Sequence, residues 1–188
     1  MVSRLESVGT FLWRRAISRV APGRAVRHER QQSYYAFVFG PVAVTVRYWE
    51  EFGPDVEGGA RVELRRCEPV VGPAHRDGAA GFRVLPVGEG GIWRADLFTV
   101  IGRPGLEPRY HHHPRFARQD VGRRVFDPAL TADPVGWAVR KLEDLRSLLI
   151  ESGAADIADA VDYDAHTDAL PVIRQTIERC LTAPPGAL

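Results

Sequence analysis

Apolar and polar residues alternate through much of the segment between residues 33 and 116. Residues 61–67 (Arg-Val-Glu-Leu-Arg-Arg-Cys) repeat with period two, which is typical of a strand with one buried face. Residues 33–49 are rich in β-branched and aromatic side chains, but Gly40-Pro41 should bend or split this strand because proline cannot donate to a ladder. Further strands are expected at residues 81–87, 92–101 and 109–113. The pattern predicts an antiparallel meander of about five strands.

Helical spacing of apolar residues marks both ends of the chain. Residues 3–20 begin with the spacing of a capping box and predict an N-terminal helix. Asp133-Pro134 combines a good N-cap with the residue best tolerated at the first helical position, and Gly153 is a plausible C-terminal cap for the helix that follows. Shorter helical patterns lie at about 154–161 and 171–182.

Strands followed by helices predict an α+β fold in which the helices pack on one face of the sheet. The length of 188 residues suits a single domain spanning residues 1–188. Within it we expect a basic N-terminal helix and linker at 1–30, an antiparallel sheet at 33–116 and a helical C-terminal part at 133–182.

The composition indicates the cellular location to expect. No run approaches the ~20 apolar residues of a transmembrane segment, and residues 1–30 lack the apolar core of a secretory signal, so a cytoplasmic location is expected. The two cysteines, Cys67 and Cys180, have neither disulfide-framework nor metal-cage spacing.

The charge is nearly balanced overall but unevenly distributed. A formal net charge of +1 argues against specific nucleic-acid binding. Residues 1–30 hold seven arginines against two glutamates, a charge of +5, whereas residues 141–188 hold four basic and nine acidic residues, a charge of −5. One functional hypothesis is therefore association with a membrane surface or nucleic acid through the basic N-terminal helix.

Three consecutive histidines, His111 to His113, form the most unusual local feature. In a strand, His111 and His113 share a face with their backbones about 7 Å apart, while His112 points away. Asp96 lies on the preceding strand, which should return through the turn at residues 102–108, so it is the best candidate for a third ligand. The register decides whether Asp96 meets the His111/His113 pair or His112.

These residues support two classes of function. Asp96, His111 and His113 could hold a divalent metal (zinc, iron or manganese) that activates water or polarises a substrate, with Arg94 or Arg109 attracting a small anionic molecule. Without a metal, an Asp and His pair involving Asp96 and His112 could act in acid–base catalysis. The alternative is a structural cluster at a strand end.

No complete catalytic constellation can be assembled from the sequence, so a small-molecule-binding or interaction module without catalysis is the first functional hypothesis and the metal enzyme the second. Residues 162–168 carry three aspartates and a histidine but lack the spacing of a calcium loop, and a turn between helices is expected there. Residues 88–91 (Gly-Glu-Gly-Gly) are also expected to form a turn.

Residues 93–98 (Trp-Arg-Ala-Asp-Leu-Phe), residues 110–116 (Tyr-His-His-His-Pro-Arg-Phe) and the helix start at Asp133-Pro134, with Trp137 after it, resemble segments of an uncharacterised actinobacterial family, a domain of unknown function. The resemblance covers roughly residues 35–152. It implies a shared domain but transfers no catalytic residue, because no activity accompanies the family.

Overall fold

A computed structural model of the chain describes residues 30–52, 55–67, 70–71, 83–84, 87–103, 106, 108–117 and 120–183. The predicted helix at residues 3–20 lies outside this part of the chain. No helix among the described residues is long and apolar enough to cross a membrane.

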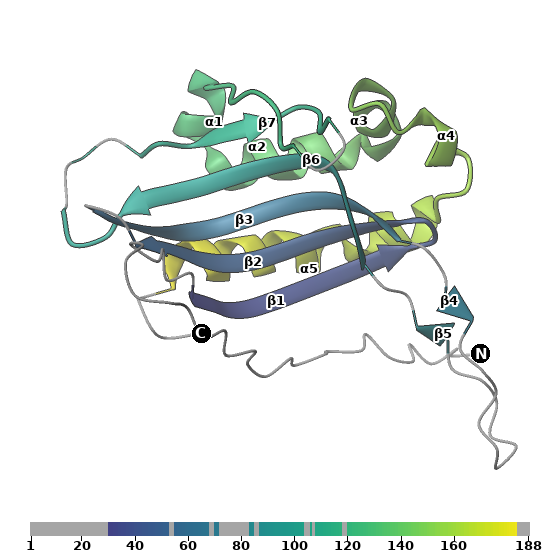
Figure 1. Cartoon of the computed structure of the whole chain (residues 1–188), viewed down its shortest axis with the longest axis horizontal. Coiled ribbons are helices and arrows are strands. Elements are labelled where there is room, and N and C mark those ends of the chain that lie inside the picture. Colours follow the sequence, from purple (N-terminus) through teal and green to yellow (C-terminus); the bar gives the residue numbers. More distant parts are fainter. Residues whose placement is uncertain are drawn as a thin grey trace, which may run out of the picture.

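Five antiparallel strands form the main sheet and follow one another in chain order (Figure 1). They are β1 (Arg30–Phe39), β2 (Val42–Phe52), β3 (Val56–Cys67), β6 (Val87–Val100) and β7 (His111–His113). Between β3 and β6 the chain forms a separate two-stranded pair, β4 (Val70–Val71) with β5 (Arg83–Val84). The predicted five-stranded antiparallel sheet and the α+β class are therefore confirmed.

Glycines explain two details of this sheet. Gly40 has a φ of 69° and, with Pro41, makes the two-residue turn that separates β1 from β2, as the sequence predicted. Gly59 has a φ of 153°, and a side chain there would place a Cβ 2.0 Å from the carbonyl oxygen of Leu97. The predicted turn at residues 88–91 is wrong, because these residues lie in the first part of β6, where the pairing with β3 is irregular.

Five helices follow the sheet in the described part of the chain, and in Figure 1 the two longest, α2 (Pro134–Glu143) and α5 (Tyr163–Thr182), lie behind it. The five are α1 (Pro128–Ala132), α2 (Pro134–Glu143), α3 (Leu145–Glu151), α4 (Ala155–Ala158) and α5 (Tyr163–Thr182). Asp133 caps α2 as predicted, accepting a hydrogen bond from the backbone N–H of Gly136 at 3.0 Å.

Two helix boundaries differ from the prediction. The helix expected from residue 134 onward is interrupted at Asp144, whose side chain accepts from the N–H of Ser147 and caps α3. The expected turn at residues 162–168 is wrong, because Asp162 caps α5 and the helix continues through Pro171. Tertiary packing of the apolar face of α5 outweighs the local cost of that proline.

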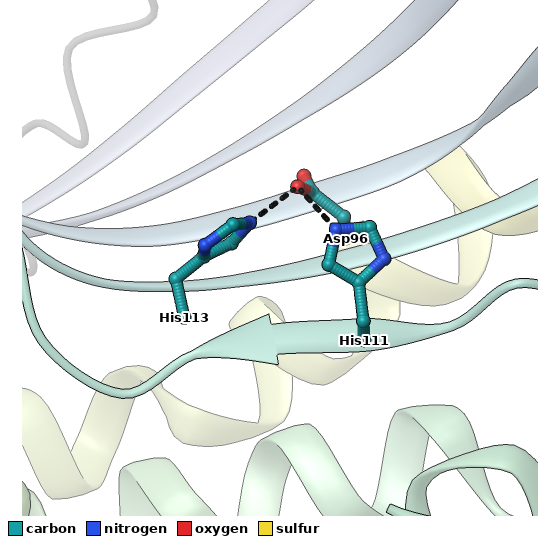
Figure 2. Close-up of side chains that lie close together, drawn as sticks. All are labelled: Asp96, His111 and His113. Atoms are coloured by element: carbon teal, nitrogen blue, oxygen red, sulfur yellow. Dashed lines mark ion pairs between the residues drawn. The ribbon is translucent and has the colours of Figure 1, made fainter. Parts of the chain in front are cut away.

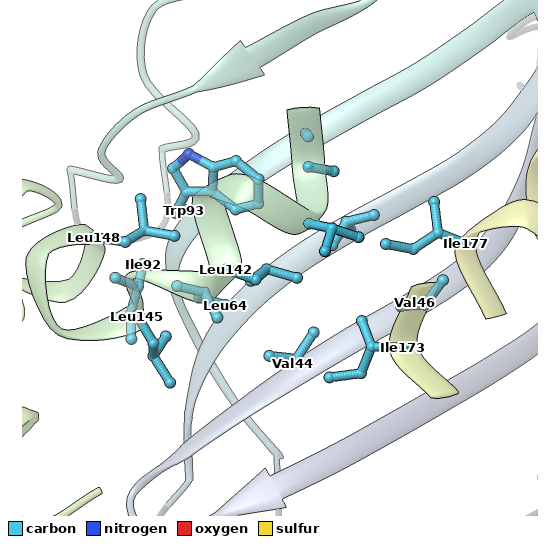
Figure 3. Packing of buried hydrophobic residues seen from close by; sticks show 14 of the residues in the cluster. Val44, Val46, Leu64, Ile92, Trp93, Leu142, Leu145, Leu148, Ile173 and Ile177 are labelled. Carbon is cyan, nitrogen blue, oxygen red and sulfur yellow. The ribbon is translucent and has the colours of Figure 1, made fainter. Parts of the chain in front are cut away.

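A continuous hydrophobic core lies between the sheet and the helices (Figure 3). Side chains at alternate positions of the strands face the helix layer, and Trp93 of β6 stacks on Trp137 of α2 with their ring centroids 6.1 Å apart. Ile173 and Ile177 of α5 are fully buried against the sheet. Each such side chain contributes about 1.5–3 kcal/mol through burial.

The intervening strand positions face the opposite side of the sheet, which no described helix covers. This open face is unusually polar. Its central positions are occupied by Arg47, Arg61, Glu63, Arg94 and Asp96, together with two histidines of β7.

Candidate metal site

The pairing of β6 with β7 fixes the register that the sequence left open. Asp96 pairs with His111, Arg94 with His113 and Ala95 with His112. Because side chains alternate along each strand, the carboxylate of Asp96 lies on the same face as the rings of His111 and His113. The short strand β7 is held on its other side by Val125, which exchanges two backbone hydrogen bonds of 2.9 Å with His112.

Figure 2 shows both imidazole rings directed toward the same carboxylate. The Nε2 atoms of His111 and His113 lie 3.5 Å and 3.6 Å from Oδ2 of Asp96. The three ligand atoms all lie within 4.8 Å of one another. All three residues are buried, with exposed fractions of 2% for Asp96, 7% for His111 and 2% for His113.

Backbone carbonyl groups orient both rings. The Nδ1 of His111 lies 2.9 Å from the carbonyl oxygen of Arg109, and the Nδ1 of His113 lies 3.3 Å from that of Gly122. A carbonyl oxygen can only accept, so each Nδ1 carries the proton and donates it. The lone pair of a neutral ring is then on Nε2, which points toward Asp96.

Arg61 holds the carboxylate from the other side. Its Nε donates to Oδ1 of Asp96 at 2.5 Å, which leaves Oδ2 directed toward the histidines. Burial works to raise the pKa of the Asp96 carboxyl, but the interaction with His113 and the charge of Arg61 outweigh it and hold the pKa well below its usual range. Asp96 is therefore a carboxylate at neutral pH.

His111 stays neutral under the same conditions. Burial lowers its pKa, and this effect exceeds the raising effects of the Arg109 carbonyl and the Asp96 charge. Its Nε2 is buried and has no hydrogen-bond partner among the described residues. A buried nitrogen lone pair thus faces a carboxylate oxygen at 3.5 Å, an arrangement that is repulsive unless a proton or a metal cation lies between them.

The remaining candidates from the sequence lie apart from this triad. His112 faces the helix layer, where its ring packs on that of Trp137 with centroids 4.9 Å apart. Arg94 pairs with the buried carboxylate of Glu63, its Nη2 lying 2.5 Å from Oε1. The side chain of Arg109 is exposed and pairs with Glu57 at 3.4 Å, so only its carbonyl group reaches the triad.

Sequence reasoning missed the ion-pair cluster around Glu63. This carboxylate is fully buried and contacts three arginines: Arg47 at 3.1 Å, Arg65 at 2.9 Å and Arg94. The period-two pattern of residues 61–67 did carry a signal, because it placed Arg61, Glu63 and Arg65 together on the face away from the core.

Two weaker candidates contribute nothing to the triad. The acidic residues between 162 and 168 belong to the first turns of α5, and His166 among them is buried edge-on against Phe39, with ring centroids 5.1 Å apart. The basic N-terminal segment proposed for membrane or nucleic-acid association lies outside the described residues except for Arg30.

Comparison with known proteins yields no match: no family model, no curated protein and no solved structure resembles the chain closely enough to be assigned. The resemblance noted from its motifs stays a prediction.

Proposed function

We propose that the protein binds a divalent transition metal ion, most suitably zinc, through Asp96, His111 and His113. The observation that carries this proposal is the convergence of two imidazole Nε2 atoms on one buried, ionised carboxylate oxygen, with the Nε2 of His111 left without a hydrogen-bond partner among the described residues. A dication among the three atoms would accept a lone pair from each of them.

The types of the ligand atoms suit zinc, which proteins bind through imidazole nitrogen and carboxylate oxygen. With metal–ligand distances of about 2.1 Å, neighbouring ligand atoms lie about 3.4 Å apart in a tetrahedral site. The separations of 3.5 Å and 3.6 Å between the imidazole nitrogens and Oδ2 are close to this value, and the three ligand atoms lie within 4.8 Å of one another. Iron and manganese are the other metals that such a ligand set accepts.

The surroundings of the ligands also suit a metal. Each ring is fixed by a backbone carbonyl, and the carboxylate is fixed by Arg61, which is how second-sphere groups orient metal ligands in proteins. All three ligands come from paired strands, so their positions depend on the sheet rather than on a loop.

Three protein ligands leave a tetrahedral ion with one open position, the arrangement of catalytic rather than structural zinc sites. We infer that this position binds water or a substrate oxygen, and that the function is a metal-dependent hydrolytic or hydration reaction. The metal would lower the pKa of bound water to about 7 and so supply hydroxide at neutral pH. His111 is the most exposed ligand, and the exposed ring of Phe126 packs beside it with centroids 5.6 Å apart, so we infer that substrate approaches from this side.

The test is metal content measured by mass spectrometry in the untagged full-length protein after dialysis and zinc reconstitution. We expect about one equivalent of zinc in the wild type and its loss in the His111→Gln/His113→Gln double variant. His112→Gln is the matched control, because His112 lies on the same strand but faces the helices. Zinc-restored hydrolysis of ester or phosphoester substrates in the wild type alone would extend the result to catalysis.

Equal zinc content in the wild type and the double variant would contradict the proposed ligands. Absence of zinc, iron and manganese from the wild type after reconstitution would contradict the metal site altogether. The function would then revert to a small-molecule-binding or interaction domain without catalysis, in which the triad is a structural cluster.

A further inference from the structure

The described residues at the centre of the open face carry more positive than negative charge. Three arginines, which we call the arginine cluster, lie beside two acidic residues: Arg47, Arg61 and Arg94 beside Glu63 and Asp96, a surplus of +1. A zinc ion in the triad would raise this surplus to +3. The side chains of these arginines are only 11–12% exposed, so solvent screens the surplus weakly.

The strand register makes the arginine cluster continuous with the candidate metal site. Arg47 pairs with Arg61, and Arg61 pairs with Asp96, so these residues form one row across β2, β3 and β6. His111 completes the row on β7. A ligand on the arginine cluster would therefore lie next to the metal, not at a separate site.

The arginines of the cluster repel one another. Burial lowers the pKa of Arg47, and although Glu63 opposes this effect, Arg61, Arg65 and Arg94 lower it further. Glu63 and Asp96 together do not neutralise the cluster, and an added anion would.

One hydrogen-bond donor of the arginine cluster is left for such an anion. The Nε of Arg47 is buried and has no hydrogen-bond partner among the described residues. The Nε of Arg61 donates to Asp96. The guanidinium group of Arg61 is held over the rings of Trp49 at 4.6 Å and Phe98 at 5.2 Å, which fixes its plane.

We propose that the arginine cluster binds the oxyanion group, a carboxylate or a phosphate, of a small molecule that reaches the adjacent metal ion. This inference rests on the proposed function, for which it supplies the substrate class. Planar arginine forks match both oxyanions, and their burial strengthens the attraction. The apolar rings of Trp49 and Phe98, which contact the guanidinium group of Arg61, would border the ligand.

Isothermal titration calorimetry on the zinc-loaded full-length protein tests this inference, with inorganic phosphate and malonate as separate probes. We expect at least one of them to bind, and the stronger probe identifies the phosphate or the carboxylate class. Arg47→Gln should weaken that binding by about tenfold or more without loss of zinc, because Arg47 contacts Glu63 and not the triad. Arg140→Gln is the matched control, since Arg140 lies on the helix side in an exposed pair with Asp133.

Failure of both probes to bind, or equal affinity in the Arg47→Gln and Arg140→Gln variants, would overturn the inference. Should Arg47→Gln not fold, Arg47→Lys retains a charge beside Glu63 but removes the Nε donor, and it should also weaken binding. Zinc bound normally without any anion binding would overturn this inference alone. Anion binding that depends on Arg47 in a protein that takes up no metal would overturn the metal site and leave the arginine cluster as an anion site.

Discussion

Replacement of Glu63 by glutamine is the strongest test of the electrostatics of the open face. The side chain is fully buried and is the shared partner of Arg47, Arg65 and Arg94. Removing its charge leaves these three arginines without the carboxylate that they share. Breaking a buried ion pair by removing one partner costs about 3–5 kcal/mol, and we expect Glu63→Gln to lower the free energy of unfolding by this amount.

Differential scanning calorimetry and urea denaturation measure this loss. For a chain of this length the expected fall in Tm is about 6–20 °C. Glu57→Gln is the matched control because Glu57 forms a more exposed pair with Arg109, with side-chain exposures of 27% and 65%, and its replacement should change stability by no more than about 1 kcal/mol. A Glu63→Gln variant as stable as Glu57→Gln would refute the view that Glu63 holds the cluster together.

The pH dependence gives an independent check on the same residue. Burial favours the protonated form of Glu63, but the charges of Arg47, Arg94 and Arg65 outweigh it and lower the pKa below its ordinary value of 4.5. The unfolded chain therefore binds this proton more readily than the folded chain. The stabilisation by Glu63 is present above pH 4.5 and is lost as the pH falls toward the folded pKa, so the difference between wild type and Glu63→Gln should shrink on acidification.

Three further predictions concern the metal, the core and the backbone. Zinc at about 100 times its Kd should raise the free energy of unfolding of the wild type by about 2.7 kcal/mol, as measured by calorimetry. The His111→Gln/His113→Gln variant should not be stabilised, and equal stabilisation of both proteins would contradict the proposed ligands. Ile177→Ala should cost about 2–5 kcal/mol in urea denaturation, because Ile177 is fully buried, whereas Val172→Ala, at a 50% exposed position of the same helix, should cost about 0.5 kcal/mol or less. Gly59→Ala should prevent normal folding, as judged by circular dichroism, because the new Cβ would lie 2.0 Å from the Leu97 carbonyl oxygen. Gly102→Ala, at a φ of 79° but with nothing within 4 Å of its Cβ, should lower the free energy of unfolding by only about 1–3 kcal/mol. Similar losses of stability in the two glycine variants would refute the steric argument.

Most of the sheet was predictable because its strands alternate cleanly. The strand expected at residues 81–87 is not part of it, because Arg83–Val84 pairs with β4 instead, and the glycines at 88–91 lie within β6. The helices were less predictable. The first turns of α5 are polar and Pro171 follows them, so the local sequence between 162 and 168 indicates a turn. The cap at Asp162 and the packing of Ile173 and Ile177 on the sheet stabilise the helix instead. The interruption at Asp144 was equally hidden, because the apolar spacing continues across it.

The candidate site shows the same division between local and long-range information. Period two was enough to place His111 and His113 on one face, but it could not choose between the two registers for Asp96. That choice depends on pairing between β6 and β7 across a long connection, which local sequence does not specify. The position of Glu63 among the arginines depends on the pairing of three strands, so local sequence could not predict it.

One face of the sheet packs the hydrophobic core, and the other carries the ionised groups. On β6, the alternation that buries Trp93, Ala95 and Leu97 beneath the helices necessarily directs Arg94 and Asp96 to the open face. Hydrophobic packing on the first face stabilises the strands, so the second can carry ionised groups whose desolvation would be unfavourable on its own. Asp96 joins the two parts of that open face, because one carboxylate oxygen accepts from the arginine cluster while the other faces the histidines. A metal on one oxygen and an anion on the arginines would act through the same carboxylate, so each should strengthen the binding of the other by the same factor.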